Sequence, residues 1–216
     1  MEEQVRSKQR VAEYGEVFTG KREVNAMLDL VKQETERIDS RFLEPACGTG
    51  NFLTEILRRK LGVVEKRYGS SQVEFERYAV LAVSSIYGID ILEDNVTHCR
   101  LLLFGIFDDQ YLRLFKNKTH DDCRDAVRYI LDRNIILGDA LSLKTVGDDP
   151  QPIIFAEWSL VNGSKIKRRD FSFQDLLMHE SLSDLPLFSD LGEDVFIPQP
   201  EKDYPPIHIR ELPHAQ

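Results

Sequence analysis

Apolar positions along the first three quarters of the chain follow two alternating patterns. Stretches with an apolar side chain every three or four positions are typical of amphipathic helices, and short continuous apolar runs are typical of buried strands. The first pattern predicts helices over residues 22–38, 52–61, 73–85, 94–115 and 122–132, the fourth with a break near Asp108 and Asp109. The second predicts strands over residues 41–44, 86–90, 134–137 and 152–156. Asn51 is placed to cap the second helix.

Strands that alternate with helices predict a doubly wound, mostly parallel α/β sheet. We expect residues 1–163 to form this domain, because the pattern weakens beyond about Gly163. A basic cluster and a short helix over residues 171–177 follow, and then an acidic, proline-containing tail. Residues 164–216 are therefore expected to be an irregular C-terminal arm that lies on the domain or on a partner.

The composition of the chain favours a soluble cytoplasmic protein over a membrane or secreted one. Among 216 residues, 42% are hydrophobic and 30% are charged, as in an ordinary soluble protein. No apolar run approaches the roughly 18 residues of a membrane span, and the polar start is unlike a secretory signal. Three cysteines without C-x-x-C spacing favour a reducing cytoplasm. The net charge of −9 comes mostly from residues after Asp170, so a polyanion can approach the rest of the chain.

The most informative segment joins the first predicted strand to the second predicted helix. It has the sequence E-P-A-C-G-T-G-N over residues 44–51, and Gly48 and Gly50 permit the close approach of a ligand to the backbone. A dinucleotide fingerprint would require a third glycine at the position of Leu53, and the Gly-Lys-Ser/Thr ending of a P-loop is missing. Nicotinamide and nucleoside-triphosphate cofactors are therefore disfavoured.

Three successive strands end in acids, namely Glu44, Asp90 and Asp139. The carboxyl ends of parallel strands meet at one edge of a sheet, where ligands bind. A carboxylate after the second strand can accept both hydroxyl protons of a ribose, and one after the third can accept from an adenine amino group. Three carboxylates suit a cationic ligand better than a phosphate ester.

Together these segments closely resemble the S-adenosylmethionine-binding motifs of the adenine-specific DNA methyltransferases of restriction–modification systems. The resemblance covers about residues 10–160 and includes a segment before the first strand, Tyr14–Gly20, which ends in glycine where the family usually has proline. It implies a Rossmann-like methyltransferase fold with a seven-stranded sheet and S-adenosylmethionine as cofactor. The residues that it implies for cofactor binding are Phe18, Thr19, Glu44, Ala46, Cys47, Gly48, Gly50, Asp90, Ile91, Asp139 and Ala140.

The resemblance fails at the family's catalytic motif, an Asn-Pro-Pro-aromatic sequence after the fourth strand. Its polar groups bind the target amino group and its ring stacks on the flipped base. Here the strand runs into Ala156, and the candidate catalytic residues are Glu157, which can accept from an amino group, and Trp158, which can stack. The candidate DNA-backbone contacts are Lys165, Lys167, Arg168 and Arg169.

The leading hypothesis is a methyltransferase that acts on DNA adenine, with a homodimer or a separate specificity or catalytic subunit as partner. Only about 55 residues follow the fourth strand, too few for a target-recognition domain as well as the remaining strands. The alternative is a non-catalytic methyltransferase-like subunit that binds the cofactor or a protein. A third hypothesis is methyl transfer to a small molecule or protein. The five histidines are scattered, so no metal site is expected.

Overall fold

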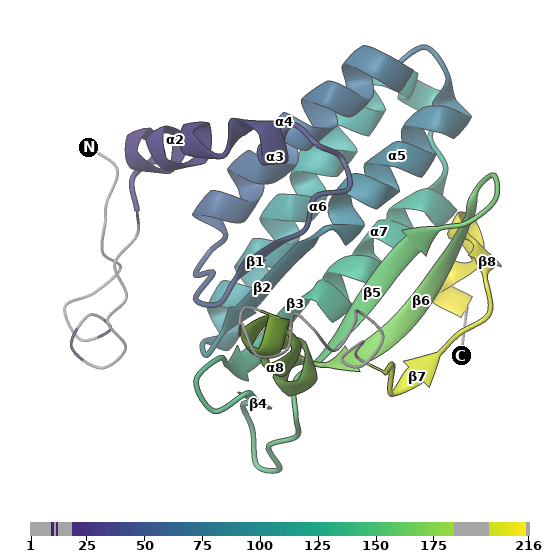
Figure 1. Ribbon diagram of the computed structural model, residues 1–216. Coiled ribbons are helices and arrows are strands. Elements are labelled where there is room, and N and C mark those ends of the chain that lie inside the picture. Colours follow the sequence, from purple (N-terminus) through teal and green to yellow (C-terminus); the bar gives the residue numbers. More distant parts are fainter. Residues whose placement is uncertain (1–9, 11, 13–18, 184–198, 215–216) are drawn as a thin grey trace.

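The computed structural model describes residues 10, 12, 19–183 and 199–214, with the backbone alone for residues 179–183. Strands form a layer beside a stack of helices (Figure 1). The helices are α2 (Lys21–Leu30), α3 (Lys32–Thr35), α4 (Asn51–Tyr68), α5 (Gln72–Ser84), α6 (Glu93–Phe115), α7 (Asp121–Asn134) and α8 (Phe173–Ser183), with 3₁₀ turns η1 (Lys116–Lys118) and η3 (Ile209–His214). The strands are β1 (Phe42–Glu44), β2 (Ile86–Asp90), β3 (Ile135–Asp139), β4 (Lys144–Thr145), β5 (Ile154–Leu160), β6 (Lys165–Ser172), β7 (Lys202–Asp203) and β8 (Ile207–His208).

The first sheet has the order β1-β2-β3-β4. Its first three strands are parallel neighbours, and the short β4 pairs antiparallel with β3. Helices α4 and α5 connect β1 to β2, and α6 and α7 connect β2 to β3. The predicted alternation of strands and helices is confirmed for these elements, which make a mixed α/β fold with a mostly parallel sheet.

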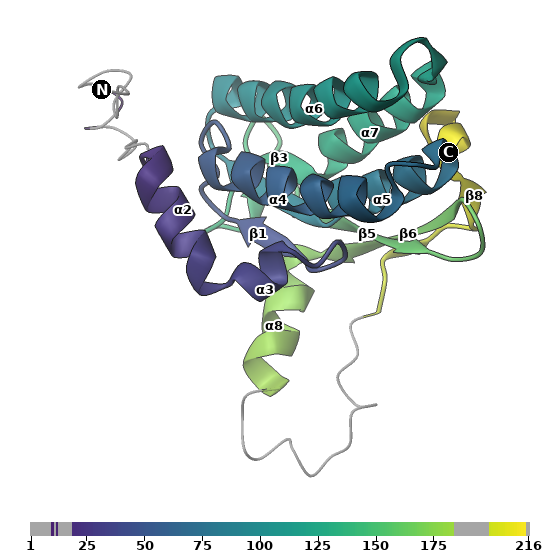
Figure 2. The ribbon, with the colours of Figure 1, turned by 90° about the horizontal axis from the view of Figure 1, so that it is seen from above.

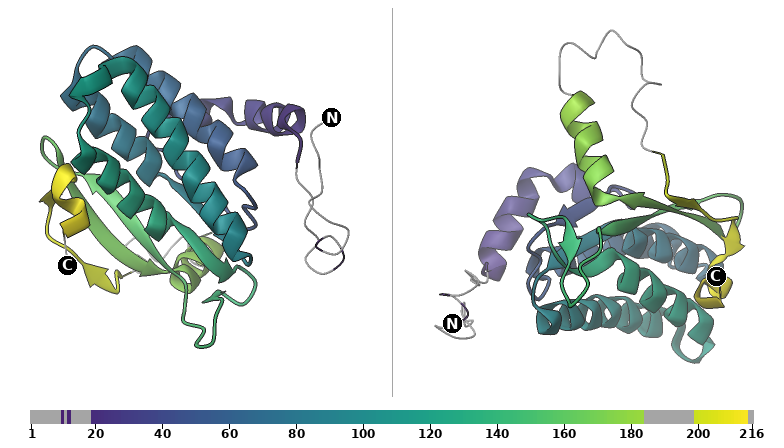
Figure 3. Two further views of the ribbon diagram at one scale, coloured as in Figure 1. Left: turned by 180° about the vertical axis from the view of Figure 1, so that it is seen from behind. Right: turned by 90° about the horizontal axis from the view of Figure 1, so that it is seen from below.

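The two faces of this sheet are covered unequally. Helices α4, α5, α6 and α7 pack on one another over one face, whereas α8 lies on the opposite side (Figures 2 and 3). Because successive residues of a strand point to opposite faces, each face has its own core. Ile86 and Ile135 belong to the core under the four helices, and Tyr87 and Ile89 pack on the other face with Phe173 of α8.

The strand expected over residues 152–156 differs from the prediction in its bounds and in its pairing, because it belongs to a second sheet. β5 begins at Ile154 and pairs antiparallel with β6 over its whole length, and β7 and β8 pair with β6. The hairpin turn falls at the expected domain boundary of residue 163, so β6 continues the sheet of β5 into the segment expected to be irregular. Four basic residues within five positions of β6 hide the apolar alternation that would have indicated a strand.

Three helix predictions are also corrected. α6 has no break at Asp108, because that carboxylate faces α7 and accepts a hydrogen bond from Arg124 (2.5 Å). The helix expected over residues 22–38 is divided at Val31, whose backbone is not helical. The short helix expected to start at residue 171 starts at Phe173. None of the helices in the described ranges is both long and apolar enough to cross a membrane.

Residues 199–214 return to the helical layer at their end. Ile209 and Leu212 of η3 are each only 2% exposed and join the main core. Arg210, between them, reaches Glu76 of α5 with a nitrogen–oxygen distance of 2.7 Å. This docking fastens the end of the described chain to α5 and α7.

The ammonium group of Lys60, on α4, is buried under the segment that leads into β1. The Lys60 side chain is 0% exposed, and its Nζ donates to the carbonyl oxygens of Ile38 (3.2 Å) and Ser40 and to the Ser85 hydroxyl (2.7 Å). Burial lowers the pKa of Lys60 to about 7, because the ammonium form loses its hydration.

We expect Lys60 to make the protein more stable as the pH rises above about 7. An unfolded lysine titrates near ~10.4, so between these values the unfolded chain holds a proton that the folded chain lacks. The free energy of unfolding then rises by up to about 1.4 kcal/mol per pH unit. Urea unfolding of the wild type and of Lys60→Met across this range measures the effect. The variant should lose the rise, and an equal rise in both proteins would contradict the assignment.

Candidate cofactor site

The loop after β1 is a tight turn that runs into α4. Gly48 and Gly50 both have positive φ, at 53° and 89°. The Cys47 amide donates to the Ile89 carbonyl of β2 (2.9 Å), and the Gly50 amide donates back to the Cys47 carbonyl (2.8 Å). These bonds join the loop to the neighbouring strand and fix its shape.

Gly50 also meets a steric limit imposed by α6. A Cβ atom at Gly50 would lie 2.6 Å from the Sγ of Cys99, closer than side-chain atoms pack. Gly50 is the N-cap of α4, and no side chain caps this helix. The prediction that Asn51 caps it is therefore wrong: Asn51 is the first helical residue, and its side chain donates to the Thr19 carbonyl (3.0 Å).

Asp90, at the end of β2, holds this loop in place. The side chain is 9% exposed, and one carboxylate oxygen accepts from the Gly48 amide (2.8 Å). The other oxygen accepts from the Leu92 amide (2.9 Å) and the Asn95 side chain (3.2 Å). A carboxylate offers about four acceptor positions, so one position remains for a ligand hydroxyl.

Strand register directs the three acids to one face of the sheet. Glu44 is opposite Gly88, two residues before Asp90, and Asp90 is opposite Leu137, two residues before Asp139. Residues that are level, or two apart, in parallel strands share a face. Glu44, Asp90 and Asp139 therefore share the helix-covered face, each two residues further along than the last.

The two outer acids differ in their surroundings. Burial raises the pKa of Glu44, although a backbone hydrogen bond from Ala46 opposes this. Asp139 is partly exposed, and a hydrogen bond from the Leu141 amide (2.9 Å) holds its pKa below the usual value. Both therefore differ from Asp90, whose carboxylate supports the loop.

The remaining loop residues divide into exposed and buried. Ala46 is exposed, and Ile91, just after Asp90, is 39% exposed. Cys47 is buried, and its pKa is raised by the neighbouring Cys99 thiol and by burial, so it is a packed thiol and not a reactive one. Ala140 is half-buried against the second core.

The candidate residues Phe18 and Thr19 precede β1 in the chain. Thr19 is joined to the glycine loop through the Asn51 side chain. Phe18 lies outside the described residues, as do Tyr14 to Val17. The structure therefore places Thr19, near the end of the segment Tyr14–Gly20, next to the start of α4.

Neither candidate catalytic residue, Glu157 or Trp158, has a free side chain that could act at this loop. The Glu157 carboxylate forms ion pairs with Arg41 and with Arg169 (2.5 Å), so each of its two oxygens lies against a guanidinium group. Trp158 is only 4% exposed, and its indole N–H donates to the Asn134 side chain (2.9 Å). In this conformation the indole packs inside the protein and has no free face for a base.

Three of the four residues of the basic cluster are already paired. Lys167 is paired with Asp203 (2.9 Å), Arg168 with Asp170 (2.6 Å), and Arg169 with Glu157. Lys165 is exposed. Because charges that are paired within the protein attract a phosphate backbone less, the structure favours a DNA contact at this cluster less than the sequence does.

Sequence reasoning missed two residues that support the site. Asn95 donates to Asp90, and Cys99 backs Gly50. Both lie on α6, four positions apart, and therefore share a helix face. That spacing was visible in the sequence, but nothing in the pattern indicated that this face would lie against the glycine loop.

The donors and acceptors present fit an adenosyl ligand with a cationic amino-acid end. Asp90 has one acceptor position left for a ribose hydroxyl, and the exposed Ile91 next to it offers an apolar surface to a base. Glu44 and Asp139 supply negative charge on the same face.

The chain was compared with protein-family models, with curated proteins and with solved structures. None of the three comparisons finds a match.

Proposed function

We propose that this chain binds S-adenosylmethionine at the carboxyl ends of β1, β2 and β3, and that it is a methyltransferase with a Rossmann-like fold. The observation that carries the proposal is the hydrogen bond between the Gly48 amide and Asp90, because it joins the glycine loop to the acid that would hold the ribose. The bound cofactor would supply an electrophilic methyl group on a sulfonium. The sequence resemblance supports the amino group of a DNA adenine as acceptor.

Three groups of residues would hold the cofactor. The backbone of Ala46 to Gly50 would surround the methionine end, with Thr19 on its other side, and the sequence resemblance assigns Phe18 to the same contact. Asp90 and Ile91 would hold the ribose and one face of the adenine, and Asp139 with Ala140 would contact the adenine amino group. Glu44 would offset the positive charge of the ligand.

We expect calorimetric titration of S-adenosylmethionine to give saturable binding that Asp90→Asn weakens at least about tenfold. The substitution removes the charge and turns an N–H toward the Gly48 amide. It therefore weakens the ribose contact and destabilises the loop conformation. Asp125→Asn is the matched control, because Asp125 is an exposed acid on α7 that is paired with Arg128. No heat with the folded wild type, or equal weakening by both variants, would refute the proposal.

A second candidate function is a non-catalytic methyltransferase-like subunit. The observation that favours it is the pairing of Glu157 with two arginines together with the burial of Trp158, because neither candidate catalytic side chain is free. Transfer of a labelled methyl group from the cofactor to DNA of mixed sequence separates the two functions. Incorporation by this chain alone identifies an enzyme, and cofactor binding without incorporation supports the subunit.

A further inference from the structure

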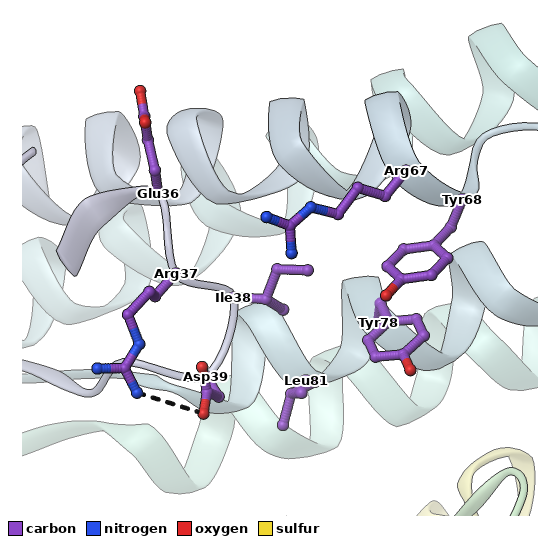
Figure 4. Close-up of a pocket in the computed structure, with 8 residues that line it drawn as sticks. All are labelled: Glu36, Arg37, Ile38, Asp39, Arg67, Tyr68, Tyr78 and Leu81. Carbon is purple, nitrogen blue, oxygen red and sulfur yellow. Dashed lines mark ion pairs between the residues drawn. The ribbon is translucent and has the colours of Figure 1, made fainter. Parts of the chain in front are cut away.

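A pocket of about 430 Å³ lies away from the glycine loop, between the segment after α3, the end of α4 and the second turn of α5 (Figure 4). This volume lies within the range of small-molecule sites in proteins. Its lining residues are Glu36, Arg37, Ile38, Asp39, Arg67, Tyr68, Tyr78 and Leu81.

Among the four charged residues that line the pocket, one cation has no anionic partner among the residues that the structure describes. Arg37 is paired with Asp39 (3.6 Å) and with Glu34 (3.3 Å), and Glu36 is paired with Lys32 (3.6 Å). For Arg67 the described part of the chain provides no ion-pair partner, and Figure 4 shows its guanidinium directed over the Ile38 side chain. The pocket therefore contains one planar cation that is free to pair with an anion.

The opposite wall is apolar and aromatic. Ile38 is only 7% exposed, and Leu81 lies beside it. The rings of Tyr68 and Tyr78 are stacked, with centroids 3.9 Å apart and planes within 9° of parallel. The neighbouring Tyr78 hydroxyl raises the pKa of Tyr68, and a tyrosine of ordinary pKa is already protonated at neutral pH, so this phenol is a hydrogen-bond donor there.

The wall is also held rigid from behind. The buried Lys60 donates to the carbonyl oxygens of Ile38 and Ser40, on either side of Asp39. Ser85 donates to the Ile38 carbonyl as well (3.3 Å). A surface that is fixed before binding loses little conformational entropy when a ligand arrives.

We propose that this pocket binds a small organic anion, a carboxylate or a phosphate monoester on a flat apolar body. Arg67 pairs with the anionic group through its planar fork of N–H donors. The apolar body lies on Ile38, Leu81 and the stacked tyrosines, because these surfaces gain from losing contact with water. The inference does not depend on S-adenosylmethionine binding, since none of these residues belongs to the glycine loop.

Titrations of the full chain with phenyl phosphate and with benzoate, followed by two-dimensional amide NMR and by calorimetry, test the site. We expect at least one probe to shift the amides of Ile38 and Leu81 with a Kd of about 1 mM, typical of so few ligand atoms. Which of the two binds more tightly identifies the anionic group. Inorganic phosphate lacks the apolar body, and benzyl alcohol lacks the anionic group. Each should therefore bind at least about tenfold more weakly.

Variants of Arg67 separate this site from non-specific binding. Arg67→Ala should raise the Kd at least about tenfold, and Arg67→Lys should do so less, because a lysine keeps the charge but loses the fork. Arg58→Ala is the matched control, because Arg58 is exposed on the same helix and paired with Glu55. The proposal is overturned if neither organic anion binds at about 10 mM, if inorganic phosphate binds as tightly as phenyl phosphate, or if Arg67→Ala leaves binding unchanged.

Discussion

Arg210→Ala is expected to lower the free energy of unfolding by about 3 kcal/mol, because it removes the arginine partner of a buried carboxylate. Glu76 is 5% exposed, and both Nε and one terminal nitrogen of Arg210 donate to its Oε2 (3.2 and 2.7 Å). Burial alone would raise the pKa of Glu76, but hydrogen bonds from Tyr111 and Arg210 outweigh it and lower that pKa. Urea unfolding followed by circular dichroism measures the loss.

Two further variants separate the effect of the buried charge from that of any lost ion pair. Arg113→Ala removes an arginine whose side chain is 60% exposed and paired with Glu65, and should cost much less than Arg210→Ala does. In a Glu76→Gln background, where no charge is buried, Arg210→Ala should also cost much less than in the wild type. Equal losses in the two backgrounds would contradict this account.

Gly50→Ala is expected to cost about 3 kcal/mol and to abolish S-adenosylmethionine binding. Two penalties combine: a φ of 89°, which disfavours any residue with a Cβ, and a contact of 2.6 Å between that Cβ and the Sγ of Cys99. Thermal unfolding measures the stability, and calorimetry measures the binding.

Removing the thiol tests the steric half of this prediction. In a Cys99→Ala background the Sγ is absent, so Gly50→Ala should cost only the backbone penalty of about 1–2 kcal/mol. Cys123→Ala is the matched control, because Cys123 is a buried thiol on α7. A cost for Gly50→Ala that is the same in all three backgrounds would show that the clash contributes nothing.

The sequence predicted those elements whose signals are local. β2 has the bounds expected from its apolar run, and α4 begins where the glycine loop ends. β6 was not predicted, because a strand with adjacent basic residues acquires its stability from pairing with β5, and such pairing leaves no local signal.

For the candidate site, the sequence located the loop and its acids but not the state of the candidate catalytic side chains. Glu157 was taken as a free acceptor, yet Arg41 is 116 positions away in the chain and pairs with it in space. Trp158 was taken as a stacking platform, yet Asn134 holds its indole. Both outcomes depend on which distant residues the fold brings to β5, and no motif spacing carries that information.

The hydrogen bond between Trp158 and Asn134 gives the protein an internal spectroscopic reporter. Trp158 is the single tryptophan of the chain, and its indole lies where β5 meets the end of α7. Its emission should move to longer wavelength when the β5–β6 hairpin leaves the helical layer. Fluorescence can therefore follow the separation of the hairpin from the helices. This signal is independent of circular dichroism, which is dominated by the helices.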